Sequence, residues 1–99
     1  MTRCVTIKER AIADLDAIYW HSAEKWGRQQ ARAYLEALEG LFQLLAVEPE
    51  IARERIEFDP PVRLHPFRSH VVAFRADETI VDILRVVHAR SDWQAVMPD

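Results

Sequence analysis

The chain has 99 residues, of which 49% are hydrophobic and 29% charged, so we expect a single domain, residues 1–99, with one modest core. It contains one cysteine and no Cys/His cluster with zinc spacing, which excludes an internal disulfide and predicts no metal site. The net charge of −3 argues against binding nucleic acid by general electrostatic attraction.

The hydropathy of the chain argues against a membrane protein. No apolar run approaches the roughly 20 residues that cross a bilayer, and the N-terminal residues lack the apolar stretch of a secretion signal. We therefore expect a cytoplasmic protein. Seven arginines lie between Arg53 and Arg90, and their planar guanidinium groups suit carboxylate or phosphate partners, although a solvated sheet face would carry them equally well.

The first half of the chain predicts a strand and a helical hairpin. Residues Arg3–Ile7 are β-prone, and from Glu9 the hydrophobic period is helical. Gly27 ends the first helix and Pro49 ends the second. Because very few residues join the helices, they must fold back on each other. The apolar stripe expected to face the core on the first helix is Ile12, Leu15, Ile18, Ser22 and Trp26.

The second half predicts a sheet. The polar stretch Glu48–Pro61 indicates a surface loop, and a period near two then marks strands at Val62–Phe67, His70–Arg75 and Thr79–His88. Their short connections imply an antiparallel meander, and the last strand is apolar on both faces, as expected of an interior strand. The fold class is therefore α+β, in the order β-α-α-β-β-β, with a helical hairpin on one face of an antiparallel sheet. The other face is left for a site or a partner.

Three stretches of the sequence resemble the RelE/ParE superfamily of toxins. The first helix contains ADLDAIYW at residues 13–20 and KWG at residues 25–27, similar to the family's opening helix. The centre contains LLAVEP at residues 44–49 and RLHPF at residues 63–67. The most specific stretch is ILRVVHARSDW at residues 83–93, similar to the family's last strand and tail.

The resemblance is better for the ParE branch than for the RelE branch, because no tyrosine occurs after Tyr34. It implies the toxin of a type II toxin–antitoxin system that inhibits DNA gyrase by binding, without catalytic residues or a cofactor of its own. The residues it implies for target binding are Arg85, His88, Arg90, Asp92 and Trp93.

Two alternatives remain open from the sequence. A RelE-like, ribosome-dependent mRNA endoribonuclease would use Arg63, Arg85 and His88, since a histidine near neutral pKa can transfer protons. In a purely structural interpretation, His88 only ends a strand and hydrogen-bonds the nearby backbone. The second alternative is a non-toxic antitoxin-binding module. Cys4 is expected to be a buried strand residue, because no neighbouring motif would activate its thiol.

The resemblance also implies a partner. A toxin of this kind is made with a ParD-like antitoxin, in a complex of at least two copies of each chain, and would contact DNA only through that antitoxin. We expect the antitoxin to bind near the polar side chains of the second helix, Arg28, Arg32 and Glu36, while its folding segment wraps the hairpin.

Overall fold

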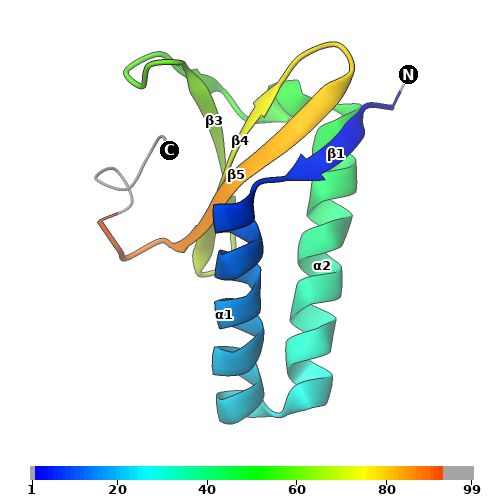
Figure 1. Ribbon diagram of the computed structural model, residues 1–99, viewed down its shortest axis with the longest axis vertical. Coiled ribbons are helices and arrows are strands. Elements are labelled where there is room, and N and C mark those ends of the chain that lie inside the picture. The colour runs from blue at the N-terminus through cyan, green and yellow to red at the C-terminus, as the bar shows by residue number, and fades with distance from the viewer. Residues whose placement is uncertain (1, 93–99) are drawn as a thin grey trace.

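Strand β1 (Cys4–Ile7) leads almost directly into helix α1 (Glu9–Trp26), and helix α2 (Arg28–Val47) follows after Gly27 alone. This computed structural model describes residues 2–92. Gly27 has a φ of 93°, a backbone conformation that side chains with a Cβ rarely adopt. It lets the chain reverse direction between the helices, which run side by side as a hairpin (Figure 1).

The chain then enters the sheet. After α2 come the 3-10 turn η1 (Pro49–Ile51), the two-residue strand β2 (Glu54–Arg55), and strands β3 (Val62–Phe67), β4 (His70–Ala76) and β5 (Ile80–His88). The strand order is β1-β5-β4-β3-β2. The pairs β2–β3, β3–β4 and β4–β5 are antiparallel, whereas β1 pairs parallel with β5.

The predicted α+β class, the helical hairpin and the interior position of the last strand are confirmed. Two details differ from the expectation. The sheet is mixed, because β1 runs parallel to β5, and it has five strands, because β2 forms inside the expected Glu48–Pro61 loop. This parallel pair joins the first and the last strand, which no short connection links, so the local sequence does not predict the pairing.

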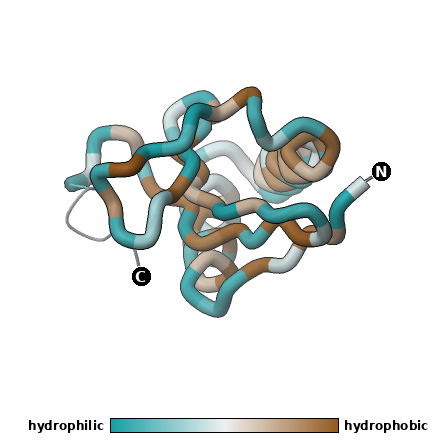
Figure 2. The backbone as a smooth tube through the Cα atoms, turned by 90° about the horizontal axis from the view of Figure 1, so that it is seen from above, coloured by the Kyte–Doolittle hydropathy of each residue, from teal (hydrophilic) through white to brown (hydrophobic). Residues whose placement is uncertain are grey.

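The main core lies between the helices and one face of the sheet. Its large buried members include Ile18, Leu38, Phe42, Leu45, Phe74 and Ile83. The other face has a smaller cluster made by Val62, Ala73, Leu84 and Val87, against which Phe58 packs from the segment before β3. The face expected to be open is therefore partly covered. Figure 2 shows hydrophobic segments along the helices and strands and hydrophilic ones in the outer loops.

Three side chains predicted to be buried are exposed instead. Trp26 is 66% exposed and Ile12 is 55% exposed, because the buried side of α1 is centred on Ala11 and Ile18. The tip of the hairpin also extends beyond the sheet (Figure 1), and Trp26 is the last residue of α1, at that tip. Cys4 is exposed as well, since it lies on an edge strand. Neither helix is long and apolar enough to span a bilayer within residues 2–92.

Candidate functional site

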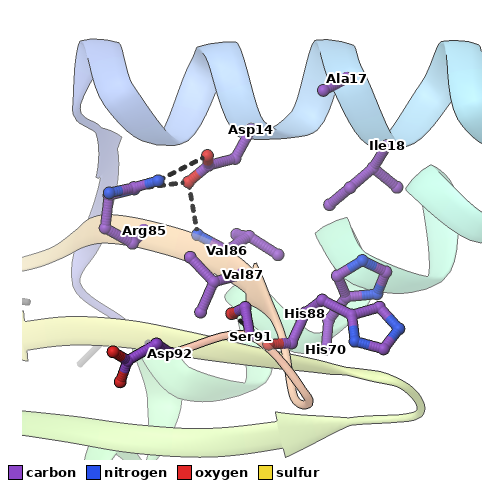
Figure 3. Close-up of a pocket in the computed structure, with 10 residues that line it drawn as sticks. All are labelled: Asp14, Ala17, Ile18, His70, Arg85, Val86, Val87, His88, Ser91 and Asp92. Carbon is purple, nitrogen blue, oxygen red and sulfur yellow. Dashed lines mark hydrogen bonds and ion pairs between the residues drawn. The ribbon is translucent and has the colours of Figure 1, made fainter. Parts of the chain in front are cut away.

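The side chain of Asp14 joins α1 to β5. One carboxylate oxygen, Oδ2, accepts hydrogen bonds from Arg85 Nε at 2.8 Å and from the backbone N–H of Val86 at 2.9 Å. The other, Oδ1, accepts from the Arg85 guanidinium at 3.0 Å (Figure 3). This ion pair raises the pKa of Arg85, because the carboxylate stabilises the charged guanidinium. Asp14 therefore neutralises Arg85, the only Asp, Glu, Lys or Arg among the last five residues of β5.

The pair lies at the place where β1 stops supporting β5. The last residue of β1, Ile7, pairs with Ile83, and beyond it no strand of the described part of the chain borders β5 on that side. An unpaired edge N–H needs another acceptor, and the Asp14 carboxylate supplies it at Val86. Both side chains are only 15% exposed, so the contact is well shielded from water.

A pocket of about 420 Å³ opens between α1 and the C-terminal end of β5. Figure 3 shows Asp14 and Arg85 at one side of it and the two histidines at the other. Its chemically active lining residues are Asp14, His70, Arg85, His88, Ser91 and Asp92. Apolar side chains such as Ile18 and Val87 form the remaining wall.

His70 and His88 face each other across β4 and β5. They are register partners, with ring centroids 5.5 Å apart. His70 Nδ1 shares a hydrogen bond of 2.7 Å with the hydroxyl of Tyr34 on α2. Burial lowers the pKa of His70, and repulsion from His88 and His21 lowers it further. His70 is therefore held in the neutral form more strongly than a free histidine.

His88 ends its strand with local hydrogen bonds. Its Nδ1 accepts the backbone N–H of Arg90 at 3.1 Å, so the neutral ring carries its proton on Nε2. Its carbonyl oxygen accepts the Ser91 hydroxyl at 2.6 Å. The sequence had left such a backbone contact open for His88, and within residues 2–92 its Nε2 makes no hydrogen bond.

The structure brings some of the predicted target-binding residues together. Arg85, His88 and Asp92 line the same pocket, and Arg90 is exposed beside it. Trp93 lies outside the described residues. Arg85 is the least available of the set, because Asp14 occupies its guanidinium.

The three residues named for a ribonuclease do not form one cluster. Arg63 pairs with Phe74, whereas His88 lies beside His70, the partner of Phe67 at the far end of β3. Four residues along a strand separate these positions by about 13 Å. The Arg63 guanidinium also donates to the carbonyl of Ala52 at 2.6 Å, which gives it a structural role.

The predicted antitoxin-binding residues share one helix. Arg28, Arg32 and Glu36 are all exposed on the first half of α2, at steps of four residues that keep them near one side. They line neither the pocket beside Asp14 nor the sheet core.

Sequence reasoning missed Asp14, His70 and Tyr34. A usable signal existed for Asp14: Arg85 stands in a mostly apolar interior strand, and a shielded arginine needs an anionic partner. Nothing in the local sequence linked Tyr34 to His70, because the two lie 36 residues apart on different elements.

Comparison with known proteins gave consistent matches. Residues 5–93 match the model of the family described as the ParE toxin of the type II toxin-antitoxin system, parDE. Toxin ParE1 of Caulobacter vibrioides is 33% identical over 89 residues, covering 90% of this chain and 92% of that protein. Toxin ParE1 of Mycobacterium tuberculosis is 34% identical over 83 residues, covering 83% and 85%.

A solved structure has the same fold. It is described as the chromosomal ParDE TA system from P. aeruginosa, and the matched chain has a TM-score of 0.74 at 24% identity. The match covers 88% of this chain and 96% of that one. At this identity the likeness speaks for the fold alone.

The first prediction concerns Asp14. Replacing it in Asp14→Ala leaves the Arg85 charge and the Val86 N–H without their acceptor, so we expect the free energy of unfolding to fall by about 1–3 kcal/mol. Asp14→Asn keeps one acceptor oxygen and should cost less. Urea unfolding measures both, and Asp16→Ala on the exposed side of α1 is the control. Equal losses for Asp14→Ala and Asp16→Ala would show that the contact contributes nothing to stability.

The second prediction concerns pH. Because the folded pKa of His70 is lowered, the unfolded chain binds a proton first as the pH falls through the ordinary histidine pKa of about 6.5. The contribution of neutral His70 to the free energy of unfolding is therefore complete above the unfolded-state pKa. It is lost as the pH decreases towards the lower pKa of the folded state. We expect His70→Gln to reduce the loss of stability between pH 7.5 and 5.5 in urea unfolding. His65→Gln is the control, and an unchanged pH dependence in His70→Gln would contradict the assignment.

Proposed function

The chain belongs to the ParE toxin family of type II toxin–antitoxin systems, and we propose on that premise that it inhibits DNA gyrase by binding and is neutralised by a ParD-like antitoxin. The observation that carries the proposal is the family match, which spans residues 5–93 and therefore every element of the fold. Both the target and the antitoxin would place the protein in the cytoplasm.

The state of the arginines supports inhibition by binding over RNA cleavage. A ribonuclease needs a proton acceptor, a proton donor and a free cation near one phosphate. Of the arginines named for that role, Arg85 is neutralised by Asp14, and Arg63 donates an N–H group to the Ala52 carbonyl at a position distant from His88 along the strands. Among residues 2–92, no hydrogen bond is made by Nε2 of His88. This distribution suits a surface that makes contacts without transferring protons.

The proposed gyrase-binding surface is the C-terminal end of β5 and the residues after it. His88, Arg90 and Asp92 are exposed there, and the sequence continues directly into Trp93. Exposed aromatic and arginine side chains supply most of the binding energy in typical protein interfaces. On this proposal Trp93 is the main apolar anchor and the charged residues orient the complex.

The third prediction tests the target. The purified chain should inhibit supercoiling by gyrase and increase the amount of cleaved DNA held in gyrase complexes. Trp93→Ala should raise the inhibitory concentration about tenfold or more, as expected for loss of a central anchor. Trp20→Ala is the matched control, because Trp20 is an exposed indole on α1. Equal effects of the two substitutions would argue against the proposed surface.

Expression of the chain alone separates the alternatives. Filamentous cells with DNA damage support gyrase poisoning, whereas rapid loss of mRNA that His88→Ala abolishes would establish the RelE-like ribonuclease in its place. Normal growth, with intact binding of the antitoxin, would identify a non-toxic antitoxin-binding module.

The exposed apolar side chains support binding of the antitoxin along the helices. An amphipathic segment that folds on binding gains affinity from such anchors. Those on or just after the helices are Ile12, Trp20, Trp26, Leu44, Val47 and Ile51. The outer edge of β1 also has no strand neighbour among the described residues, so strand addition is available there. A dimeric antitoxin would give at least two copies of each chain, and the complex would contact DNA only through it.

The fourth prediction tests this partner. We expect the chain to co-purify with the product of the adjacent gene. Removing the C-terminal half of that gene product should abolish the co-purification. Arg32→Glu should slow association several-fold at low salt and have less effect at high salt, since exposed charges act mainly on the association rate. Arg53→Glu, on an exposed loop, is the control. Undiminished binding of the truncated partner would contradict wrapping.

A further inference from the structure

A second pocket, of about 500 Å³, lies where the two helices meet the turn between β3 and β4. Figure 1 shows this turn beside the helical hairpin. The lining residues that matter here are Lys25, Trp26, Tyr34, Arg68, His70 and His88. The volume falls within the range of pockets that bind small molecules.

The charge of this pocket is opposite to that of the whole chain. The chain has a net charge of −3, yet no Asp or Glu among residues 2–92 lines the pocket. Its two permanent cations also have no carboxylate partner within residues 2–92: Lys25 Nζ lies 5.5 Å from the Trp26 ring centroid, and Arg68 packs on aromatic rings. By contrast, Lys8, Arg55 and Arg85 each pair with a carboxylate.

The fold holds Arg68 in place over the pocket wall. Its guanidinium carbon lies 5.3 Å from the ring centroid of Tyr34 and 5.0 Å from that of Phe67. Arg68 also has a φ of 55°, a left-handed conformation that a residue with a Cβ rarely adopts. Stacking on two rings leaves the N–H groups at the guanidinium edge available for an anion.

Three histidines and two hydroxyls extend the set of donors. His21, His70 and His88 line the pocket together with Ser22 and Ser69. The histidines repel one another when protonated, which is one reason for the lowered pKa of His70. An anion among them would remove that repulsion. A ligand with several acceptor oxygens fits such a cluster better than a single carboxylate does.

We propose that this pocket binds the phosphate group of a nucleotide, between Lys25 and Arg68, with the base against the exposed indole of Trp26. The aromatic surface suits a base, because stacking on aromatic side chains tolerates any base. The negative net charge argues against a long nucleic-acid tract, so the pocket takes one nucleotide unit, either free or at the end of a strand. Binding at this pocket holds whether or not the chain acts on gyrase.

The test uses Trp26 as its reporter. In a full-length chain carrying Trp20→Phe and Trp93→Phe, Trp26 is the one remaining tryptophan. Its fluorescence should change on titration with AMP, and AMP should bind about tenfold or more tightly than adenosine, because the phosphate adds charge-assisted hydrogen bonds. Inorganic phosphate should compete with AMP at higher concentration. Equal affinities for AMP and adenosine, or no binding of AMP, would overturn the proposal.

Substitutions locate the site. Lys25→Gln and Arg68→Asn should each weaken AMP binding about tenfold while leaving adenosine unaffected. Asparagine tolerates the left-handed turn conformation, so Arg68→Asn should keep the fold, which circular dichroism checks. Lys8→Gln removes one positive charge outside the pocket and is the control. If Lys8→Gln weakened AMP binding as much as Arg68→Asn, the effect would be general charge and the pocket would be excluded.

Two further ligands separate the sources. A single-stranded oligonucleotide with a 5′-phosphate that binds more tightly than AMP identifies a strand end, and weaker binding identifies a free nucleotide; either supports the phosphate site. If the oligonucleotide binds more tightly than AMP, removing its 5′-phosphate must abolish that affinity. A glutamate-rich peptide that binds through Lys25 and Arg68 while AMP does not would make this a peptide site and overturn the proposal.

Discussion

The contact of Asp14 with β5 determines how the two layers of this molecule fit together. Strand β1 supports β5 only as far as Ile83, and the rest of the β5 edge needs another acceptor. Asp14 satisfies the Val86 N–H and the Arg85 guanidinium at once. Helix α1 is therefore fixed to the sheet by directional hydrogen bonds, in addition to the non-directional packing of its apolar face. Both pockets depend on this, because each has α1 as one wall and a strand end or turn as the other.

Hydrophobic periodicity was sufficient to predict most of the fold. The change of period on the two sides of residues 48–61 separated helices from strands, and the very short link at Gly27 required a hairpin. The same periodicity could not place Trp26, because an amphipathic pattern does not say how far the sheet extends along a helix. Nor could it reveal that β1 joins β5 in parallel, since that pairing has no local signal.

Less of the candidate site was accessible from the sequence. The motif at residues 83–93 placed the predicted target-binding residues at the end of β5, where Arg85, His88 and Asp92 share a pocket. It could not separate His88 from Arg63, which the strand register places four residues, or about 13 Å, apart along the strand direction. The partners that decide what the charged groups can do come from elsewhere: Asp14 from α1 and Tyr34 from α2. Contacts of this kind follow from the docking of layers, which periodicity does not describe.

The pairing of the first strand with the last has a consequence for synthesis of the protein. Strand β1 and the helices leave the ribosome early, but Thr6 and Asp82, which are hydrogen-bonded across the β1–β5 pair, are 76 residues apart. The apolar face of the helices therefore stays uncovered by β5 until that strand is made, and only then can Arg85 bind Asp14. Long-range pairing of this kind closes slowly. The site at the end of β5 thus forms only after that strand has been made, and a chain truncated before β5 lacks Arg85 and His88.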